Sequence, residues 1–113
     1  MQQIDLVLNK GTDFACMFIC VDGVGKAVDF SGYSARMQVK NNAYGRVLDE
    51  LSTDNGRLQF DIERGSILAR FPNEITAGYP AAKLLYDIVM ENDSGYVFRA
   101  IEGSIKVRQG VTI

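Results

Sequence analysis

The 113-residue chain contains no histidine and no tryptophan, and it has only two cysteines and two prolines. The absence of histidine removes the most common general base, the Ser–His and Cys–His nucleophile pairs, and most zinc sites. We therefore expect no enzyme, no cofactor and no metal centre. The residues favour a structural or binding module.

Charge blocks and long apolar runs are also missing. The 12 basic and 14 acidic residues are well mixed, with a formal net charge of −2, so nucleic acid is not an expected partner. No run approaches the 18 or more apolar residues of a membrane span, so a membrane is not an expected partner either. Residues 1–5 lack the features of a signal peptide, which predicts synthesis in the cytoplasm.

The two cysteines, Cys16 and Cys20, lie four residues apart in an apolar run. On a strand their Cα atoms would be about 13 Å apart, since each residue advances the chain by roughly 3.3 Å. A disulfide needs a separation of about 4.4–6.8 Å. The spacing therefore predicts two free, buried thiols on one face of a strand.

Apolar residues recur with period two between short turn sequences, which is typical of an all-β protein. The pattern predicts seven to eight strands in an antiparallel sandwich or barrel, with no internal domain boundary, so residues 1–113 are expected to form a single domain. The expected strands cover residues 4–8, 14–21, 33–40, 47–51, 58–62, 66–71, 84–90 and 96–108.

Four local features sharpen this prediction. Residues 14–21 are apolar on both faces, which predicts a central strand buried on two sides. The change of apolar phase near Ala100 and Ile101 predicts a β-bulge. Asn55-Gly56 is the strongest hairpin-type dipeptide in the chain, and residues 74–77 are expected to form one helical turn.

Three groups of residues superficially resemble functional motifs. Residues 23–26 lack the spacing of a phosphate-binding loop, and residues 91–93 lack that of a calcium loop. Asp49 and Glu50 are adjacent on an expected strand, so their carboxylates point to opposite faces and do not converge. We interpret all three as ordinary turn or surface residues.

The aromatic residues divide into two sets according to their position in the pattern. One set falls on apolar phases and is expected in the core: Phe14, Phe18, Phe60, Phe71 and Tyr86. The other set lies in or beside turns and is expected to make exposed contacts: Tyr44, Tyr79 and Tyr96.

Several segments together resemble a known family. Leu8–Phe14 resembles a strand-Lys-Gly-Thr/Asp-strand opening, and residues 28–40 resemble a Val-Asp-Leu-Ser-Gly block before an amphipathic strand. Thr76–Tyr79 followed by Tyr86-Asp87-Ile88 and the Gly-x-Ile-x-Val sequence of residues 103–107 complete the order. This order is similar to small immunoglobulin-like β-sandwich proteins of bacteriophage tails. The nearest named relative is the N-terminal domain of phage baseplate upper proteins.

The resemblance implies an immunoglobulin-like sandwich and a non-enzymatic virion protein of the tail, baseplate or fibre-attachment region. The expected partners are other phage tail, baseplate or fibre proteins, with a homo-oligomer among the expected assemblies. Baseplate upper proteins continue into a longer receptor-binding part, whereas this sequence stops at Ile113. An adaptor role is therefore expected in preference to direct receptor binding.

Two sets of residues are candidates for contact with a partner. The first predicted strand, as an exposed edge that accepts a partner strand, offers Ile4, Leu6, Val7 and Leu8. The C-terminal tail is the other expected pairing segment. The alternative is a carbohydrate- or protein-binding adhesion module for host recognition, in which Tyr44, Tyr79 and Tyr96 line one region. A carboxylate-based hydrolase is the third interpretation.

Overall fold

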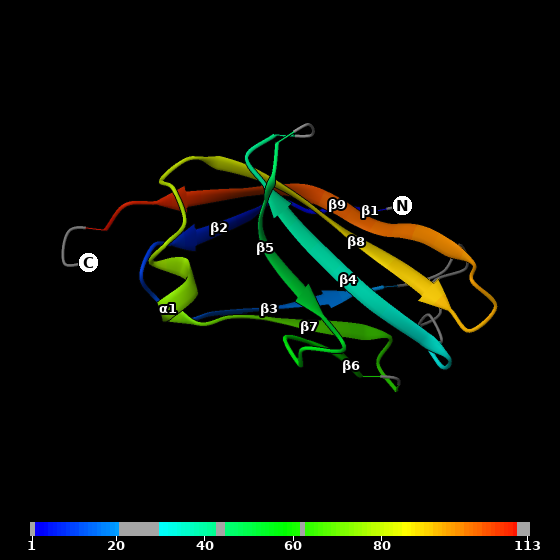
Figure 1. Cartoon of the computed structure of the whole chain (residues 1–113). Coiled ribbons are helices and arrows are strands. Elements are labelled where there is room, and N and C mark those ends of the chain that lie inside the picture. Colours follow the sequence, from blue (N-terminus) through cyan, green and yellow to red (C-terminus); the bar gives the residue numbers. More distant parts are fainter. Residues whose placement is uncertain (1, 21–29, 43–44, 62, 111–113) are drawn as a thin grey trace.

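Two β-sheets face each other in this protein (Figure 1). The computed structural model describes residues 2–20, 30–42, 45–61 and 63–110. The larger sheet has the order β1-β9-β8-β4-β5, with β2 also paired to β9. Its strands are β1 (Gln2–Gln3), β2 (Leu6–Asn9), β4 (Tyr33–Lys40), β5 (Val47–Ser52), β8 (Lys83–Asn92) and β9 (Val97–Arg108).

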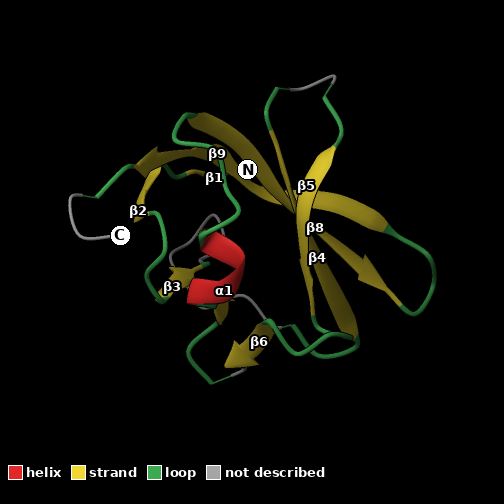
Figure 2. Ribbon diagram, turned by 60° about the vertical axis from the view of Figure 1, so that its left-hand side comes forward, coloured by secondary structure: helices red, strands yellow, loops and turns green. Residues whose placement is uncertain are grey.

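The smaller sheet has the order β3-β7-β6. It consists of β3 (Phe14–Ile19), β6 (Leu58–Asp61) and β7 (Ser66–Phe71), and a single helical turn, α1 (Asn73–Thr76), follows β7. Figure 2 shows α1 at one end of the sandwich, beside the gap between the sheets. The nine strands of the described residues confirm the predicted two-sheet, all-β architecture. The helical turn expected at residues 74–77 is confirmed, one residue earlier.

The core follows from the alternation of side chains along each strand. In β4 and β8, alternate side chains point between the sheets, and seven of them are at most 4% exposed: Ala35, Met37, Val39, Leu84, Tyr86, Ile88 and Met90. Phe18 and Phe71 close the core from the smaller sheet, each 1% exposed, while Phe14 and Phe60 pack against it partly buried. The predicted core role of the first aromatic set is confirmed.

The predicted bulge lies on β9. Ile88 pairs with Ile101, but the next residue, Val89, pairs with Arg99, so Ala100 is the extra residue. The insertion restores the inward direction of Ile101 and Ile105, both fully buried. The phase change in the sequence therefore marks a real irregularity in the ladder.

The N-terminal strands differ from the expected antiparallel arrangement. Both β1 and β2 pair with β9 in parallel, with Gln2 opposite Ile101 and Leu6 opposite Ile105. The single strand predicted over residues 4–8 is interrupted because the Asp5 side chain accepts hydrogen bonds from Ser104 N (3.0 Å) and Ser104 Oγ (3.1 Å). The sheet is therefore mixed at this edge.

The strand predicted as central is an edge strand. β3 lies at the outside of the smaller sheet, and on its outer face Met17 is 48% exposed and Ile19 is 61% exposed. Apolar residues on both faces suggested burial on both sides, but only the even-numbered side chains face the core. Cys20 is buried just beyond the strand and Cys16 is half-buried, so full burial was correct for only one of these two free thiols. Burial raises the pKa of both.

Asn55-Gly56 does not close a hairpin. It lies between β5 of the larger sheet and β6 of the smaller one, so it carries the chain across the sandwich. Gly56 has φ of 78°, the left-handed conformation that glycine adopts most easily. The sequence correctly predicted a turn at these two residues, but the strands that the turn connects do not pair with each other. Residues 23–26 and Tyr44 lie outside the described residues.

Candidate functional site

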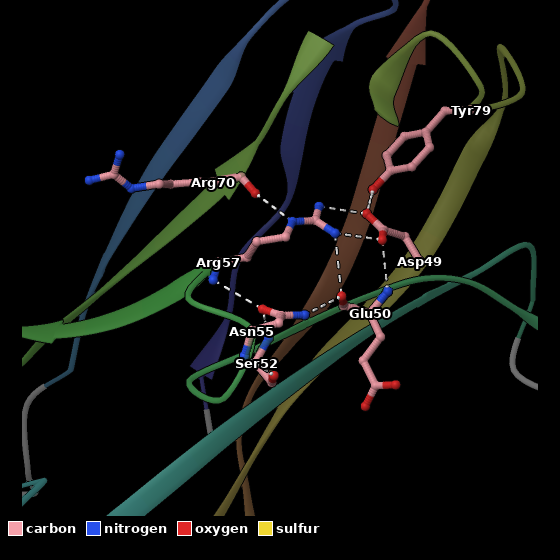
Figure 3. Close-up of polar contacts among 7 residues, drawn as sticks. All are labelled: Asp49, Glu50, Ser52, Asn55, Arg57, Arg70 and Tyr79. Atoms are coloured by element: carbon pink, nitrogen blue, oxygen red, sulfur yellow. Dashed lines mark hydrogen bonds and ion pairs between the residues drawn. The ribbon is translucent and has the colours of Figure 1, made fainter. Parts of the chain in front are cut away.

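Asp49, Arg57 and Tyr79 form a buried polar cluster between the two sheets (Figure 3). Arg57 Nη1 and Nη2 each donate a 2.7 Å hydrogen bond to a different carboxylate oxygen of Asp49. Tyr79 Oη donates to Asp49 Oδ2 at 2.5 Å. The Asp49 side chain is 10% exposed and that of Arg57 is 16% exposed, so both charges are largely removed from water.

The turn between β5 and β6 positions Arg57. Asn55 Oδ1 accepts hydrogen bonds from Ser52 N and Arg57 N, each at 3.0 Å, while Asn55 Nδ2 donates to Glu50 O at 3.1 Å. Arg57 Nε donates in turn to Arg70 O on β7, at 3.2 Å. The guanidinium is thus held by backbone and side-chain contacts from both sheets.

The cluster shifts the pKa of each of its members. Burial opposes ionisation of Asp49, but hydrogen bonds from Arg57 and Tyr79 and the positive charge of Arg57 outweigh it, so the pKa of Asp49 is lowered. The hydrogen bond to Asp49 raises the pKa of Arg57. Burial, then the bond to the Asp49 carboxylate, raises the pKa of Tyr79. Asp49 is therefore ionised, while Tyr79 keeps its proton.

This arrangement suits a structural tie better than acid–base chemistry. Each Asp49 oxygen accepts a hydrogen bond from Arg57, and the hydroxyl proton of Tyr79 is donated to Asp49 Oδ2. Glu50 points to the other face, where Arg36 Nε lies 3.7 Å from its carboxylate. The predicted divergence of Asp49 and Glu50 is confirmed, since neighbouring residues on a strand face opposite ways.

Sequence reasoning missed this cluster although a signal was present. Asp49 shares its phase with Leu51, which is fully buried, so the pattern places a carboxylate on an inward face. A buried carboxylate requires a charged or hydrogen-bonding partner. Arg57, eight residues further along the chain, could have been identified as that partner by its proximity, but Tyr79, 30 residues away, could not.

The three tyrosines of the adhesion hypothesis do not share one described surface. Tyr79 is 3% exposed, so its predicted exposure is wrong: the loop after α1 turns its hydroxyl inward to Asp49. Tyr96 is 61% exposed, as predicted, and its ring centroid is 5.9 Å from that of Phe98. Tyr44 lies outside the described residues.

The four candidates of the first strand lie at the edge of the larger sheet but differ in exposure. Leu8 is fully buried, and Ile4 and Leu6 are partly buried against the core. Val7 is 53% exposed. Only Val7 of the four therefore offers most of its side chain to a partner, while the contact itself stays a prediction.

The backbone of this edge is also accessible at Val7. Ile4 N donates to Glu102 O and Lys10 N to Arg108 O, each at 2.9 Å, so even-numbered residues direct their backbone toward β9. Because these directions alternate along a strand, Val7 directs its N–H and C=O away from β9. A partner strand could bond to it there.

A shallow hollow of about 490 Å³ lies over strands β4, β8 and β9. Its lining mixes charges, including Lys40, Lys83, Asp87, Arg99 and Glu102. Arg99 Nε lies 2.9 Å from Asp87 Oδ2, so these two charges are paired. No single sign or chemical class of ligand is favoured by this surface.

Within the described ranges, no three His, Cys, Asp or Glu side chains come close enough to hold a metal ion. In the same part of the chain, no helix has the length and apolar character needed to cross a membrane.

The fold is immunoglobulin-like. The chain resembles one chain of the crystal structure of ICOS in complex with ICOS-L and an anti-ICOS-L VNAR domain, with a TM-score of 0.51 and 14% identity, over 94% of this chain and 55% of that one. It is also similar to the extracellular domains 3–5 of Drosophila OTK, with a TM-score of 0.40 and 13% identity, over 95% of this chain and 33% of that one. At this identity the likeness to the ICOS complex shows the fold alone.

The chain therefore spans about half the length of the chain from the ICOS complex and about a third of the length of the OTK chain. No protein-family model and no curated protein matches the sequence. The predicted immunoglobulin-like sandwich is confirmed, and its function has to be argued from the chain's own surfaces.

Proposed function

We propose that this protein is a non-enzymatic structural component of a bacteriophage virion, in the tail, baseplate or fibre-attachment region. Its role is that of an assembly module: a rigid sandwich that presents strand edges to neighbouring subunits. The phage assignment is supported by the ordered resemblance of residues 8–107 to tail and baseplate proteins. The partners are other tail, baseplate or fibre proteins.

One observation carries the assembly role. At one side of the sandwich, β2 and β3 form the outer strands of their sheets, and both expose apolar side chains. Val7 on β2 is 53% exposed, and Met17 and Ile19 on β3 are 48% and 61% exposed. Unprotected apolar strand edges are templates for pairing with another chain.

The buried cluster supports the same role from the opposite side. There, Asp49 and Arg57 connect the two sheets through a bidentate ion pair, which resists shear between them. A sandwich whose sheets are held together on one side, and whose strand edges, among the described residues, are unpaired on the other, is suited to assembly.

Immunoelectron microscopy of purified phage particles tests this proposal. Antibodies raised against the protein should label the tail or its tip, and antibodies first absorbed with the purified protein should not. Labelling of no part of the particle, with the protein present in the lysate, would overturn the virion role.

A further inference from the structure

β3 is an unusually unprotected edge strand. Its six residues, Phe-Ala-Cys-Met-Phe-Ile, include no charge and no proline, and its pairing with β7 has no bulge. On the opposite side of the sandwich the outer strands are blunted: β5 carries Asp49 and Glu50 and its ladder is irregular, and β6 has four residues. On the same side, β2 is also open but has only four residues, so β3 is the longer free edge. Proteins usually protect free edges in such ways, so the bare edge of β3 is the exception that points to a partner.

The backbone groups at this edge can be assigned. Cys20 N donates to Gly65 O at 2.9 Å, and the two residues continue the β3–β7 register. Since hydrogen-bonded pairs alternate along an antiparallel ladder, Ala15, Met17 and Ile19 direct their N–H and C=O groups away from β7. Among the described residues, no strand pairs with this side of β3.

The position beside β3 has a counterpart in related folds. In constant-type immunoglobulin sandwiches the corresponding sheet has four strands, with the N-terminal strand next to the second. Here both N-terminal strands pair with β9 in the other sheet. From these strands the side-chain amide of Gln2 reaches the edge of β3: its Nε2 donates to Ile19 O at 3.5 Å, the outer limit of a hydrogen bond.

We propose that β3 pairs in antiparallel fashion with β3 of a second copy of this chain, about a two-fold axis at Met17. The three outward-directed residues, Ala15, Met17 and Ile19, are symmetric about that position. Each Met17 then lies opposite the other, and each Ala15 lies opposite an Ile19. Because all three residues present both groups to the edge, this register forms six backbone hydrogen bonds between the copies.

The side chains fit the same register. On the outer face, a small residue, Ala15, lies opposite a large one, Ile19, and Met17 supplies a flexible apolar contact at the axis. Leu68 on β7 pairs with Met17 and is itself only partly buried, so it extends the apolar stripe. The pairing covers exposed apolar surface on both copies and is isologous, as two-fold dimers require.

A register shifted by one pair is less favourable. It would place Asp13 opposite Ile19, and it leaves four of the six hydrogen bonds among the outward-directed residues. Asp13 Oδ1 already accepts bonds from Asn73 N (2.7 Å) and Asn73 Nδ2 (3.0 Å). The symmetric register avoids placing this carboxylate in the apolar stripe.

This inference rests on the proposed assembly function and names one partner for it. Its test uses the purified chain, so the two can fail separately. A chain that stays monomeric yet is present in particles would overturn the dimer and leave the virion role standing. A dimer that is absent from particles would do the reverse.

Disulfide trapping tests the register directly. In a Cys16→Ala/Cys20→Ala background, Met17→Cys places a thiol on the axis, where paired Cα atoms are about 5.5 Å apart and within disulfide range. Mild oxidation should give a covalent dimer in high yield. Val97→Cys, at a position on β9 that is 53% exposed, is the matched control and should give little dimer. Equal yields from the two variants would overturn the pairing.

Sedimentation equilibrium of the unmodified chain gives the second measurement. We expect a reversible dimer, and Met17→Lys or Ile19→Lys should raise its dissociation constant at least about tenfold with an unchanged circular dichroism spectrum. Met17→Lys places two like charges opposite each other at the axis, and Ile19→Lys removes the apolar contact with Ala15 of the second copy. Val97→Lys should leave the dissociation constant unchanged. A monomer up to the solubility limit would overturn the proposal.

Discussion

The carboxylate of Asp49 and the guanidinium of Arg57 join the two sheets through two parallel 2.7 Å hydrogen bonds. The residues are only eight positions apart, but one lies on β5 of the larger sheet and the other immediately precedes β6 of the smaller sheet. Bidentate pairs are among the stronger polar contacts in proteins, and this one closes the side of the sandwich opposite β2 and β3.

Replacement of Tyr79 by phenylalanine should destabilise the protein by about 1–3 kcal/mol. The substitution removes the hydroxyl that donates to Asp49 Oδ2 and preserves the buried ring. Urea denaturation measures the change in the free energy of unfolding. Tyr96→Phe, at a ring that is 61% exposed, is the control and should change stability by less than about 0.5 kcal/mol. Equal effects of the two variants would argue against the buried tie.

Removal of the guanidinium should be more damaging than removal of the hydroxyl. Arg57→Met leaves the Asp49 carboxylate, 10% exposed, without its cation, at an expected cost of about 3–5 kcal/mol. The double variant Arg57→Met/Asp49→Leu removes both charges and should recover much of that loss. The same denaturation series measures both, and a single variant as stable as the natural chain would contradict the assignment.

Acid should lower the free energy of unfolding, because it protonates the Asp49 carboxylate. Its pKa in the folded state is lowered from the ordinary value of 3.8, so the folded state favours the ionised carboxylate. That contribution is complete above pH 3.8 and is lost as the pH falls through the lower, folded-state pKa. Asp49→Asn should therefore show a smaller loss of stability than the natural chain between neutral pH and strong acid. Parallel slopes in thermal melts across this range would count against the prediction.

Gly103→Ala should detach the N-terminal strands from β9. A Cβ at this position would overlap Ile4 O, a backbone atom that cannot move without breaking the β1–β2 connection to β9. We expect a loss of several kcal/mol, since overpacking here displaces main chain. Gly78→Ala is the control, because its nearest neighbour, Ile75 O, would be at an ordinary 3.5 Å. Chemical denaturation of the two variants decides between these outcomes.

Val7→Pro should separate folding from assembly at the β2 edge. The N–H of Val7 is directed away from β9, so proline removes a donor that takes no part in the β2–β9 ladder. The purified variant should fold, with a stability close to that of the natural chain. Its incorporation into particles should fall in a complementation assay. Unchanged incorporation of this variant would argue against pairing through β2.

The sequence was sufficient to predict where the strands lie and which side chains face the core, but not which strands pair with each other. Period-two alternation located β4 and β8, and the phase change at Ala100 revealed the bulge, because both are local consequences of side-chain direction. The outer position of β3 was missed because an apolar outer face has the same pattern as a strand buried on both sides.

The remaining wrong predictions concern residues that contact each other although they are far apart in the sequence. The direction of β2 depends on β9, about 100 residues away, and turn residues before and after a strand do not encode it. Tyr79 was expected at the surface because it follows a turn, whereas its hydroxyl lies on Asp49 of another strand. Aligned positions of a family could have linked such pairs, but alternation within one sequence could not.

The most direct test of the virion role is quantitative mass spectrometry of purified phage particles from the culture that carries this sequence. We predict that the chain is present at a fixed number of copies per particle, in constant ratio to the tail proteins across gradient fractions. Its presence in the lysate but absence from the particles would contradict the role as a virion component.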